Sequence, residues 1–187
     1  MDKKNKEHIH LFESDITFTG KHATYIKFLK DDAGIFATLM DAFLTAVVLG
    51  FKHGEREPRE PETDRARIMA EVVMKKRADC LFLYHMITLL DDVGITAEER
   101  FERAFRYEAM MDHVEDVKDS LERFHAYARG GISYMYNTLT EGCTSPEDYI
   151  NKSFQFAKDY QEEIEYNSND EAYKIKLAED VQSVLRR

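Results

Sequence analysis

The stretch Ile35–Phe51, which reads IFATLMDAFLTAVVLGF, decides the fold class of this chain. Apolar side chains recur on nearly every side of the helix that the pattern predicts for Ile35–Gly50. A helix with so little polar surface has to be covered on all sides by the rest of its domain. We therefore expect it at the centre of the fold and expect Gly50 to end it, because glycine commonly stops helices.

A second apolar run, LFLYHMITLL at Leu81–Leu90, predicts another buried helix. Between the two runs lies Lys52–Pro61, where two prolines and charges of both signs prevent a packed element. Residues Arg65–Lys76 are compatible with a further helix. The two apolar runs are the expected centre of the domain.

Three capping boxes predict where later helices begin: Thr96–Glu99, Ser145–Asp148 and Ser168–Glu171. Each places a hydroxyl at the N-cap and a carboxylate three residues later, and the pair satisfies backbone N–H groups that a helix start leaves bare. Pro146 falls at the first helical position, where its missing N–H costs nothing.

Stripes of apolar residues at helical spacing lie near these predicted helix starts or C-terminal to them. In the longest stripe the apolar residues are alternately four and three positions apart, and the spacing continues in phase across Gly130 and Gly131. Antiparallel helices pack through stripes of this kind. The longest stripe and the two later ones comprise Met110, Val114, Val117, Leu121, Phe124, Ala128, Ile132, Met135 and Leu139; Ile150, Phe154, Ala157 and Ile164; and Tyr173, Leu177, Val181 and Val184.

The predicted fold class is all-α, a compact helical bundle-like domain. Short period-two alternation in residues 8–11 and 16–19 leaves open a small β element at the N-terminus. The expected division is a polar N-terminal tail (1–20), a helical core domain (21–143) and a C-terminal helical pair packed on the core (144–187).

Composition limits the classes of function. The net charge of -10 repels nucleic acid on average, so a DNA contact requires a local basic patch. The two cysteines have no metal-site spacing, the polar start lacks the apolar region of a secretory signal, and the apolar runs are too short for a membrane span. We expect a cytoplasmic protein that needs no membrane partner.

Motifs for catalysis are missing from the sequence. It contains no Gly-x-Ser-x-Gly elbow and no glycine-rich phosphate loop, and no cofactor is expected. Glu122 and His125 have the spacing of di-iron bundles, but a second copy is missing, so we interpret them as a surface pair. The acidic residues Glu108, Asp112, Glu115 and Asp116, with His113 among them, are typical of a solvated helix face, although oxygen-rich clusters also hold metal ions.

The most basic segment is Arg65–Asp79, where five positive side chains face two negative ones. Together with the preceding loop it supplies the candidate nucleic-acid or partner-binding residues; the other interpretation is a solvated face held by intramolecular ion pairs. These residues are Lys52, Arg56, Arg59, Arg65, Arg67, Lys75, Lys76 and Arg77.

Two segments resemble a small bacterial family found beside DNA phosphorothioation (dnd) gene clusters. They are Phe36–Pro58, with an apolar helix ending in Leu-Gly-Phe-Lys followed by Arg-Glu-Pro, and Phe124–Ile132, with Tyr-Ala-x-Gly-Gly-Ile. This chain departs from the family pattern at Ala126 and Arg129, and the segment after Ser145 lies outside it. The resemblance implies a role near defence against foreign DNA and supplies no catalytic residues.

The first functional hypothesis is a non-catalytic accessory or adaptor subunit of a prokaryotic defence system, acting through protein–protein contacts. An alternative is a nucleic-acid-binding or regulatory protein that uses Lys52–Arg77. A third is a metal-dependent hydrolase built on Glu108, Asp112, His113 and Asp116. Other subunits of a defence complex are the expected partners, and self-association stays open.

Overall fold

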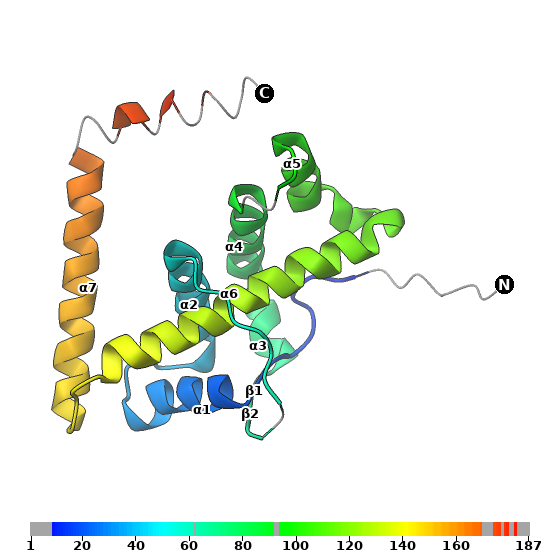
Figure 1. The fold of residues 1–187 in the computed structure, drawn as a ribbon. Coiled ribbons are helices and arrows are strands. Elements are labelled where there is room, and N and C mark those ends of the chain that lie inside the picture. The colour runs from blue at the N-terminus through cyan, green and yellow to red at the C-terminus, as the bar shows by residue number, and fades with distance from the viewer. Residues whose placement is uncertain are drawn as a thin grey trace.

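Two crossing helices, α2 (Leu39–His53) and α6 (Val114–Thr140), form the centre of the molecule in a computed structural model (Figure 1). The structure describes residues 9–61, 63–91, 94–169, 174–176, 178–179 and 182. The predicted all-α class is confirmed, with one small two-stranded sheet near the N-terminus. The other elements are β1 (Ile16–Thr19), α1 (Lys21–Lys27), a π-helical turn (Phe28–Asp32), β2 (Arg65–Ile68), α3 (Ala70–Lys75), α4 (Arg77–Leu90), α5 (Ala97–Phe105), two 3-10 turns (Tyr107–Ala109 and Met111–His113) and α7 (Pro146–Asn169).

Helix α2 begins at Leu39, four residues later than predicted. Thr38 has extended backbone angles, and its hydroxyl accepts a hydrogen bond from the backbone N–H of Asp41 at 3.1 Å. This N-cap satisfies an otherwise bare donor, so the helix starts at the cap rather than where the apolar pattern starts.

Gly50 does not end α2, contrary to the prediction. The helix continues to His53 and stops at Gly54, whose φ of 68° is left-handed. Such a conformation at the end of a helix favours glycine, because a side chain would clash there.

Gly50 instead belongs to a glycine seam, the contact formed by Gly50, Gly130 and Gly131. A Cβ atom at Gly131 would lie 1.8 Å from the carbonyl oxygen of Ala46, and one at Gly50 would lie 2.0 Å from that of Tyr127. A Cβ at Gly130 would lie 2.1 Å from the carbonyl oxygen of Glu55. The backbones of α2, α6 and the loop after α2 therefore touch, which only glycine permits.

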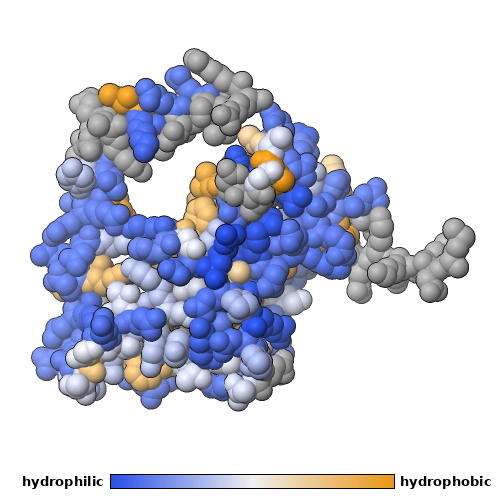
Figure 2. Space-filling model, viewed as in Figure 1, coloured by the Kyte–Doolittle hydropathy of each residue, from blue (hydrophilic) through white to orange (hydrophobic). Residues whose placement is uncertain are grey.

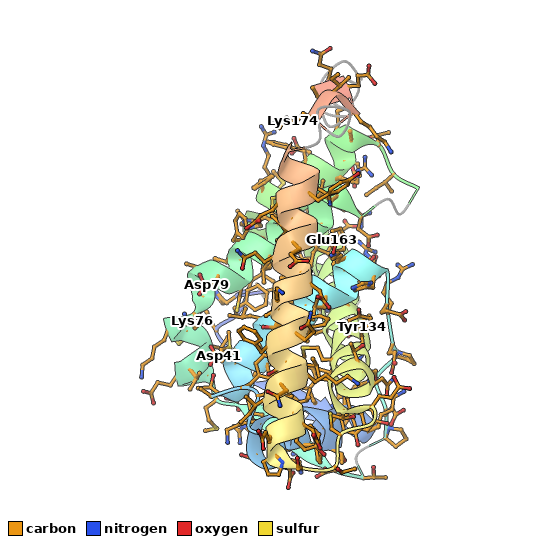
Figure 3. The ribbon with its side chains drawn as sticks, turned by 90° about the vertical axis from the view of Figure 1, so that its left-hand side faces the viewer. Asp41, Lys76, Asp79, Tyr134, Glu163 and Lys174 are labelled. Atoms are coloured by element: carbon orange, nitrogen blue, oxygen red, sulfur yellow. The ribbon has the colours of Figure 1, made fainter. Side chains whose placement is uncertain are left out.

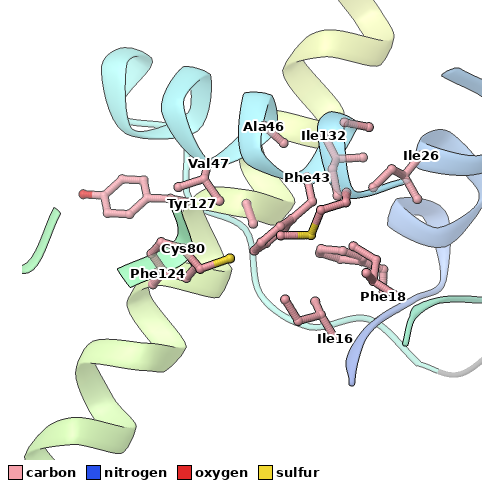
Figure 4. Close-up of a cluster of buried hydrophobic side chains, with 14 of the residues drawn as sticks. Ile16, Phe18, Ile26, Phe43, Ala46, Val47, Cys80, Phe124, Tyr127 and Ile132 are labelled. Atoms are coloured by element: carbon pink, nitrogen blue, oxygen red, sulfur yellow. The ribbon is translucent and has the colours of Figure 1, made fainter. Parts of the chain in front are cut away.

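The core lies where α2 and α6 meet the N-terminal segment (Figure 4). The rings of Phe43 and Phe124 lie 6.0 Å apart, and the ring of Phe12 lies 5.3 Å from that of Phe124. Leu11, Phe12, Ile16 and Phe18 are all buried, so the segment expected as a polar tail contributes four side chains to this core. In the sequence these apolar residues are separated by polar and charged ones, so the composition of residues 1–20 predicts a polar tail.

The expected short β element exists. Strand β1 pairs with β2 in antiparallel register, with Ile16 opposite Ile68 and Thr19 opposite Arg65. The predicted helix at 65–76 is therefore wrong for its first four residues. In β2 the side chains alternate exposed and buried, and Ala66 and Ile68 join the core beside β1.

The stretch Leu81–Leu90 forms a helix, as predicted, but it is buried on one side only. Cys80, Tyr84 and Ile87 of α4 face the core, whereas Phe82 is 64% exposed. The apolar composition of the run reflects two different faces, one in the core and one on the surface.

The capping box at the start of α7 is confirmed in full, since Ser145 and Asp148 cap each other reciprocally. At the start of α5 the Thr96 hydroxyl accepts the backbone N–H of Glu99 at 3.1 Å, but the Glu99 carboxylate bonds to Arg103 and Tyr107 instead. Ser168 falls inside α7 instead of before a helix, and the rest of that box lies outside the described residues. The predicted stripe from Tyr173 to Val184 also lies outside them. No helix in the described part of the chain is long and apolar enough to cross a bilayer.

Candidate partner-binding groove

Helix α7 turns steeply away from α6 (Figure 1), and a groove lies between it and the body of the molecule. The α7 groove is the cavity of about 590 Å³ between α7, α2 and α6, and its lining is almost wholly apolar. Leu49 of α2 and Met135 and Leu139 of α6 form one wall, and Phe154 and Ala157 of α7 form the other. A pocket of this size and character is typical of a binding site.

Contacts at both ends of the groove hold α7 over it. Near its first turn the ring of Tyr149 packs edge-on to Phe28 at 5.7 Å. Further along, the Lys52 ammonium lies 4.0 Å from the centre of the Tyr160 ring and 2.5 Å from a carboxylate oxygen of Glu163, which Figure 3 labels on α7. The groove is therefore bounded at both ends by contacts between α7 and the body.

The predicted apolar stripe of α7 is mostly exposed, and the helix contacts the core through Phe156 and Tyr160 instead. Ile150 is 61% exposed, Phe154 is 71% exposed and Ile164 is also exposed. The reason is geometric, because α7 follows the turn at Gly142 and diverges from α6. The stripe thus contributes to the wall and edge of the groove instead of the core.

Helix α4 adds a second exposed apolar stripe. Phe82, Met86 and Leu90 are spaced by four residues, so they lie along one face of α4, and all three are exposed. Figure 2 shows hydrophobic side chains on the α4 side of the hollow that separates this helix from α7. Contiguous exposed apolar surface of this kind usually marks a site where another molecule binds.

The predicted basic residues do not form one patch. Lys52 contacts α7, Arg67 of β2 pairs with Asp15, and the remaining lysines lie at the junction of α3 and α4. Figure 3 shows Lys76 and its partner Asp79 at the edge of the molecule, well apart from Glu163. The structure therefore separates the candidates that are close in sequence.

Most of these basic side chains already contact carboxylates. Lys75 Nζ lies 2.8 Å from Glu71, and Lys76 Nζ lies 3.3 Å from Asp79. Arg77 donates to the carbonyl oxygen of Leu11 at 3.0 Å and also lies 3.4 Å from Glu108. Arg77 thereby fixes the N-terminal segment to α4.

The other three candidates have separate surroundings. The guanidinium of Arg56 lies 5.5 Å from the centre of the Tyr127 ring, a cation–π contact. Arg65 is exposed on β2, and Arg59 lines a small polar pocket beside β1.

The acidic residues near the start of α6 are engaged with basic side chains. Asp116 lies 2.9 Å from His113 Nδ1 and 3.1 Å from Arg103, and Glu115 accepts from Lys118 at 2.9 Å. Among the residues that the structure describes, no group of three or more His, Cys, Asp or Glu is placed to hold a metal ion. The arrangement is that of a charged helix face.

The loop after α2 is fixed to α6 by a polar network. The backbone N–H of Glu57 donates to the carbonyl oxygen of Ala126 at 3.1 Å, and Arg129 Nε donates to the carbonyl oxygen of Glu57 at 2.8 Å. The Glu57 carboxylate lies 2.7 Å from both Lys21 Nζ and His22 Nε2. Burial opposes its ionisation, but the hydrogen bonds from Lys21 and His22 outweigh burial and hold the pKa of Glu57 below its usual value.

Sequence reasoning missed this network. The only signal for it is Arg129, a charged residue inside the otherwise apolar region of the longest stripe. The network and the glycine seam join the same two segments, Phe36–Pro58 and Phe124–Ile132, that carry the family resemblance. Their shared pattern therefore corresponds to a packing junction.

Comparison with known proteins gives one family. The family described as DNA sulphur modification system-associated protein 4 matches residues 16–173, which is most of the chain. No curated protein and no solved structure matches the chain.

Proposed function

Because this chain belongs to the family of DNA sulphur modification system-associated protein 4, we propose that it is a non-catalytic accessory subunit of such a system. It acts as an adaptor that binds another protein of the system through the α7 groove. The observation that carries the proposal is the groove itself, an apolar cavity whose edge includes side chains as exposed as Phe154. Exposed aromatic residues beside a cavity are typical anchors of protein interfaces.

The partner segment is an amphipathic helix with basic residues beside its apolar stripe. The groove extends along α7 from Ile150 to Tyr160, about 15 Å at the rise of an α-helix, which suits about three turns of a second helix. Helix α7 carries six acidic residues against two basic ones, and the whole chain has a net charge of -10. A basic partner is attracted by this charge and held beside the groove.

The nucleic-acid alternative has less support. Lys52, Arg67, Lys75, Lys76 and Arg77 each lie against a carboxylate of the chain itself. A phosphate would have to replace these partners one by one, at sites that the fold keeps apart. The metal-dependent hydrolase also has less support, because Asp116 lies against Arg103 and His113, and Glu108 lies against Arg77.

The test is co-purification of the full chain with the other proteins of its own gene cluster. We expect the wild-type chain to retain one of them. Phe154→Asp should reduce retention at least about tenfold, because an aspartate in an apolar interface loses the contact and buries a charge. Tyr166→Asp is the matched control, since Tyr166 is on the same helix, is also 71% exposed and does not line the groove.

Three outcomes would contradict the proposal. The first is retention of no protein by the wild-type chain, and the second is equal retention by the Phe154→Asp and Tyr166→Asp variants. The third is a wild-type dimer that Phe154→Asp converts to a monomer in light scattering, which would make a second copy the occupant. Melting temperatures of both variants should stay near the wild-type value, because both side chains are mostly in solvent.

A further inference from the structure

The exposed stripe of α4 continues towards α5 as one apolar face. Phe82, Met86 and Leu90 are between 36% and 64% exposed, and His85 lies beside Phe82 on the same side of the helix. The ring of His85 lies 5.0 Å from the ring of Phe105 of α5, which is also exposed. We call these five residues the α4 face.

The α4 face carries no charge of its own at neutral pH. Four of its side chains are apolar, and burial lowers the pKa of His85 despite the opposing effect of the nearby Glu108, so the imidazole is neutral. Apolar surface in water costs free energy that a covering apolar surface recovers. The face therefore suits an apolar occupant.

The segment that follows α7 has a complementary apolar pattern. Its described residues, 174–176, 178–179 and 182, are helical. Four apolar residues recur in it at helical spacing, and the spacing places them on one side of such a helix. They are Tyr173, Leu177, Val181 and Val184, which lie outside the described residues.

The length and position of the segment fit the α4 face. Figures 1 and 2 show α7 on one side of a hollow and α4 on the other, and the segment continues from the end of α7. As a helix, residues 173–184 span about 17 Å, compared with about 12 Å for residues 82–90 of α4. The link of residues 170–172 reaches at most about 14 Å, which exceeds the 8–10 Å or so between the axes of packed helices.

Charge and tethering favour this segment over a separate molecule. Residues 170–187 include four acidic and four basic side chains, so the acidic body of the chain does not repel the segment. A second copy would instead bring its own net charge of -10 to the contact. A segment held by a short link also has an effective concentration in the millimolar range, which a separate protein rarely reaches.

We propose that residues 173–184 form an amphipathic helix that covers the α4 face, with Leu177 and Val181 at the centre of the contact. The proposal goes beyond the adaptor function and does not depend on any protein partner. The contact is separate from the α7 groove, because no residue of the α4 face lines that groove.

The experiment is hydroxyl-radical footprinting of the full chain, with oxidation of Phe82 and Met86 measured by mass spectrometry. Leu177→Asp should weaken the contact at least about tenfold, because it places a charge in an apolar interface, and should raise both oxidation rates at least about threefold. Ile175→Asp is the matched control, since Ile175 is in the same segment, is 56% exposed and lies opposite the stripe by helical spacing. Met74, exposed on α3, is the reference whose rate should not change.

The comparison of the two variants decides the proposal. Faster oxidation of Phe82 and Met86 in Leu177→Asp alone supports it. Equal rates in the wild type and Leu177→Asp would overturn it, as would an equal rise in Ile175→Asp.

Two further outcomes would also overturn the proposal. If Leu177→Asp speeds oxidation of Phe154 in place of Phe82, the segment covers the α7 groove instead. If the wild-type rates fall when the protein concentration is raised about tenfold, a second copy covers the α4 face. Because the chain is probed alone, a failure here is independent of a failure to bind a partner protein.

Discussion

Substitution of Gly131 by alanine tests the glycine seam. The new Cβ would lie 1.8 Å from the Ala46 carbonyl oxygen, whereas ordinary contact begins at 3.4 Å, so the backbones of α2 and α6 have to separate by about 1.6 Å. The obstacle is a backbone carbonyl of a buried helix, which cannot rotate away as a side chain would. Overpacking usually costs about 1–3 kcal/mol and occasionally more, while alanine recovers about 1 kcal/mol of helix propensity.

We expect Gly131→Ala to lower the free energy of unfolding by about 3 kcal/mol: overpacking at the upper end of its range costs about 3 kcal/mol, loosening of the contact between Phe43 and Phe124 adds about 1 kcal/mol, and helix propensity recovers about 1 kcal/mol. For a chain of this length that loss corresponds to a fall of about 6–12 °C in melting temperature. The measurement is urea unfolding followed by circular dichroism, with differential scanning calorimetry for the melting temperature.

Gly142→Ala is the comparison, because Gly142 has a φ of 76° and a Cβ added there would meet nothing within 4 Å. Its cost arises from the left-handed backbone alone and should be about 1 kcal/mol. If Gly131→Ala costs no more than Gly142→Ala, the two helices are not in backbone contact and the reasoning about the seam fails.

The capping, the polar network and the cysteines give three further predictions. Thr96→Ala should destabilise the chain by about 1 kcal/mol in urea unfolding, because the N–H of Glu99 loses its acceptor, and no change would contradict the cap. The pKa of Glu57 is lower in the folded chain than its ordinary 4.5, so its stabilisation is present above pH 4.5 and is lost as the pH falls through the folded value. The free energy of unfolding of Glu57→Gln should therefore fall furthest below that of the wild type at about pH 7, and the difference should shrink in acid. A difference that does not change with pH would refute this. Burial raises the pKa of the Cys80 thiol to about 11, so a thiol reagent at about pH 8 should modify the half-exposed Cys143 first and Cys80 only after denaturation.

The parts of the fold that could be predicted from sequence are those decided by local chemistry. The caps at Thr96 and Ser145 depend on groups within four residues, and both are confirmed. The long stripe of α6 depends on helical spacing, and its members from Val117 to Leu139 are mostly buried. The role of Gly50 is hidden in the sequence, because a glycine that ends a helix and one that touches another helix look alike until the partner helix is known.

The candidate site depends on long-range geometry and is largely out of reach of the sequence. The stripe with Ile150 and Phe154 has the same spacing as one that packs on a core, and only the divergence of α7 reveals a groove. The pairs of Lys75 with Glu71 and of Lys76 with Asp79 are local, but charge counting cannot show that Arg67 meets Asp15 or that Lys52 meets Glu163. The sequence shows Arg129 as a charged residue within the apolar stripe, but it does not show that Arg129 bonds to Glu57 in the loop.

The attachment of α7 has a consequence for the dynamics of the chain. Between the Tyr149–Phe28 contact and the Lys52–Glu163 bridge, α7 borders a cavity and packs against the core through Phe156 and Tyr160. Its opening exposes less apolar area than unfolding of the centre, so it requires less free energy. In native-state hydrogen exchange, the amides of α7 should form a separate unit that exchanges well before those of α2 and α6. A bound partner helix should then slow exchange in α7 while leaving the glycine seam unchanged.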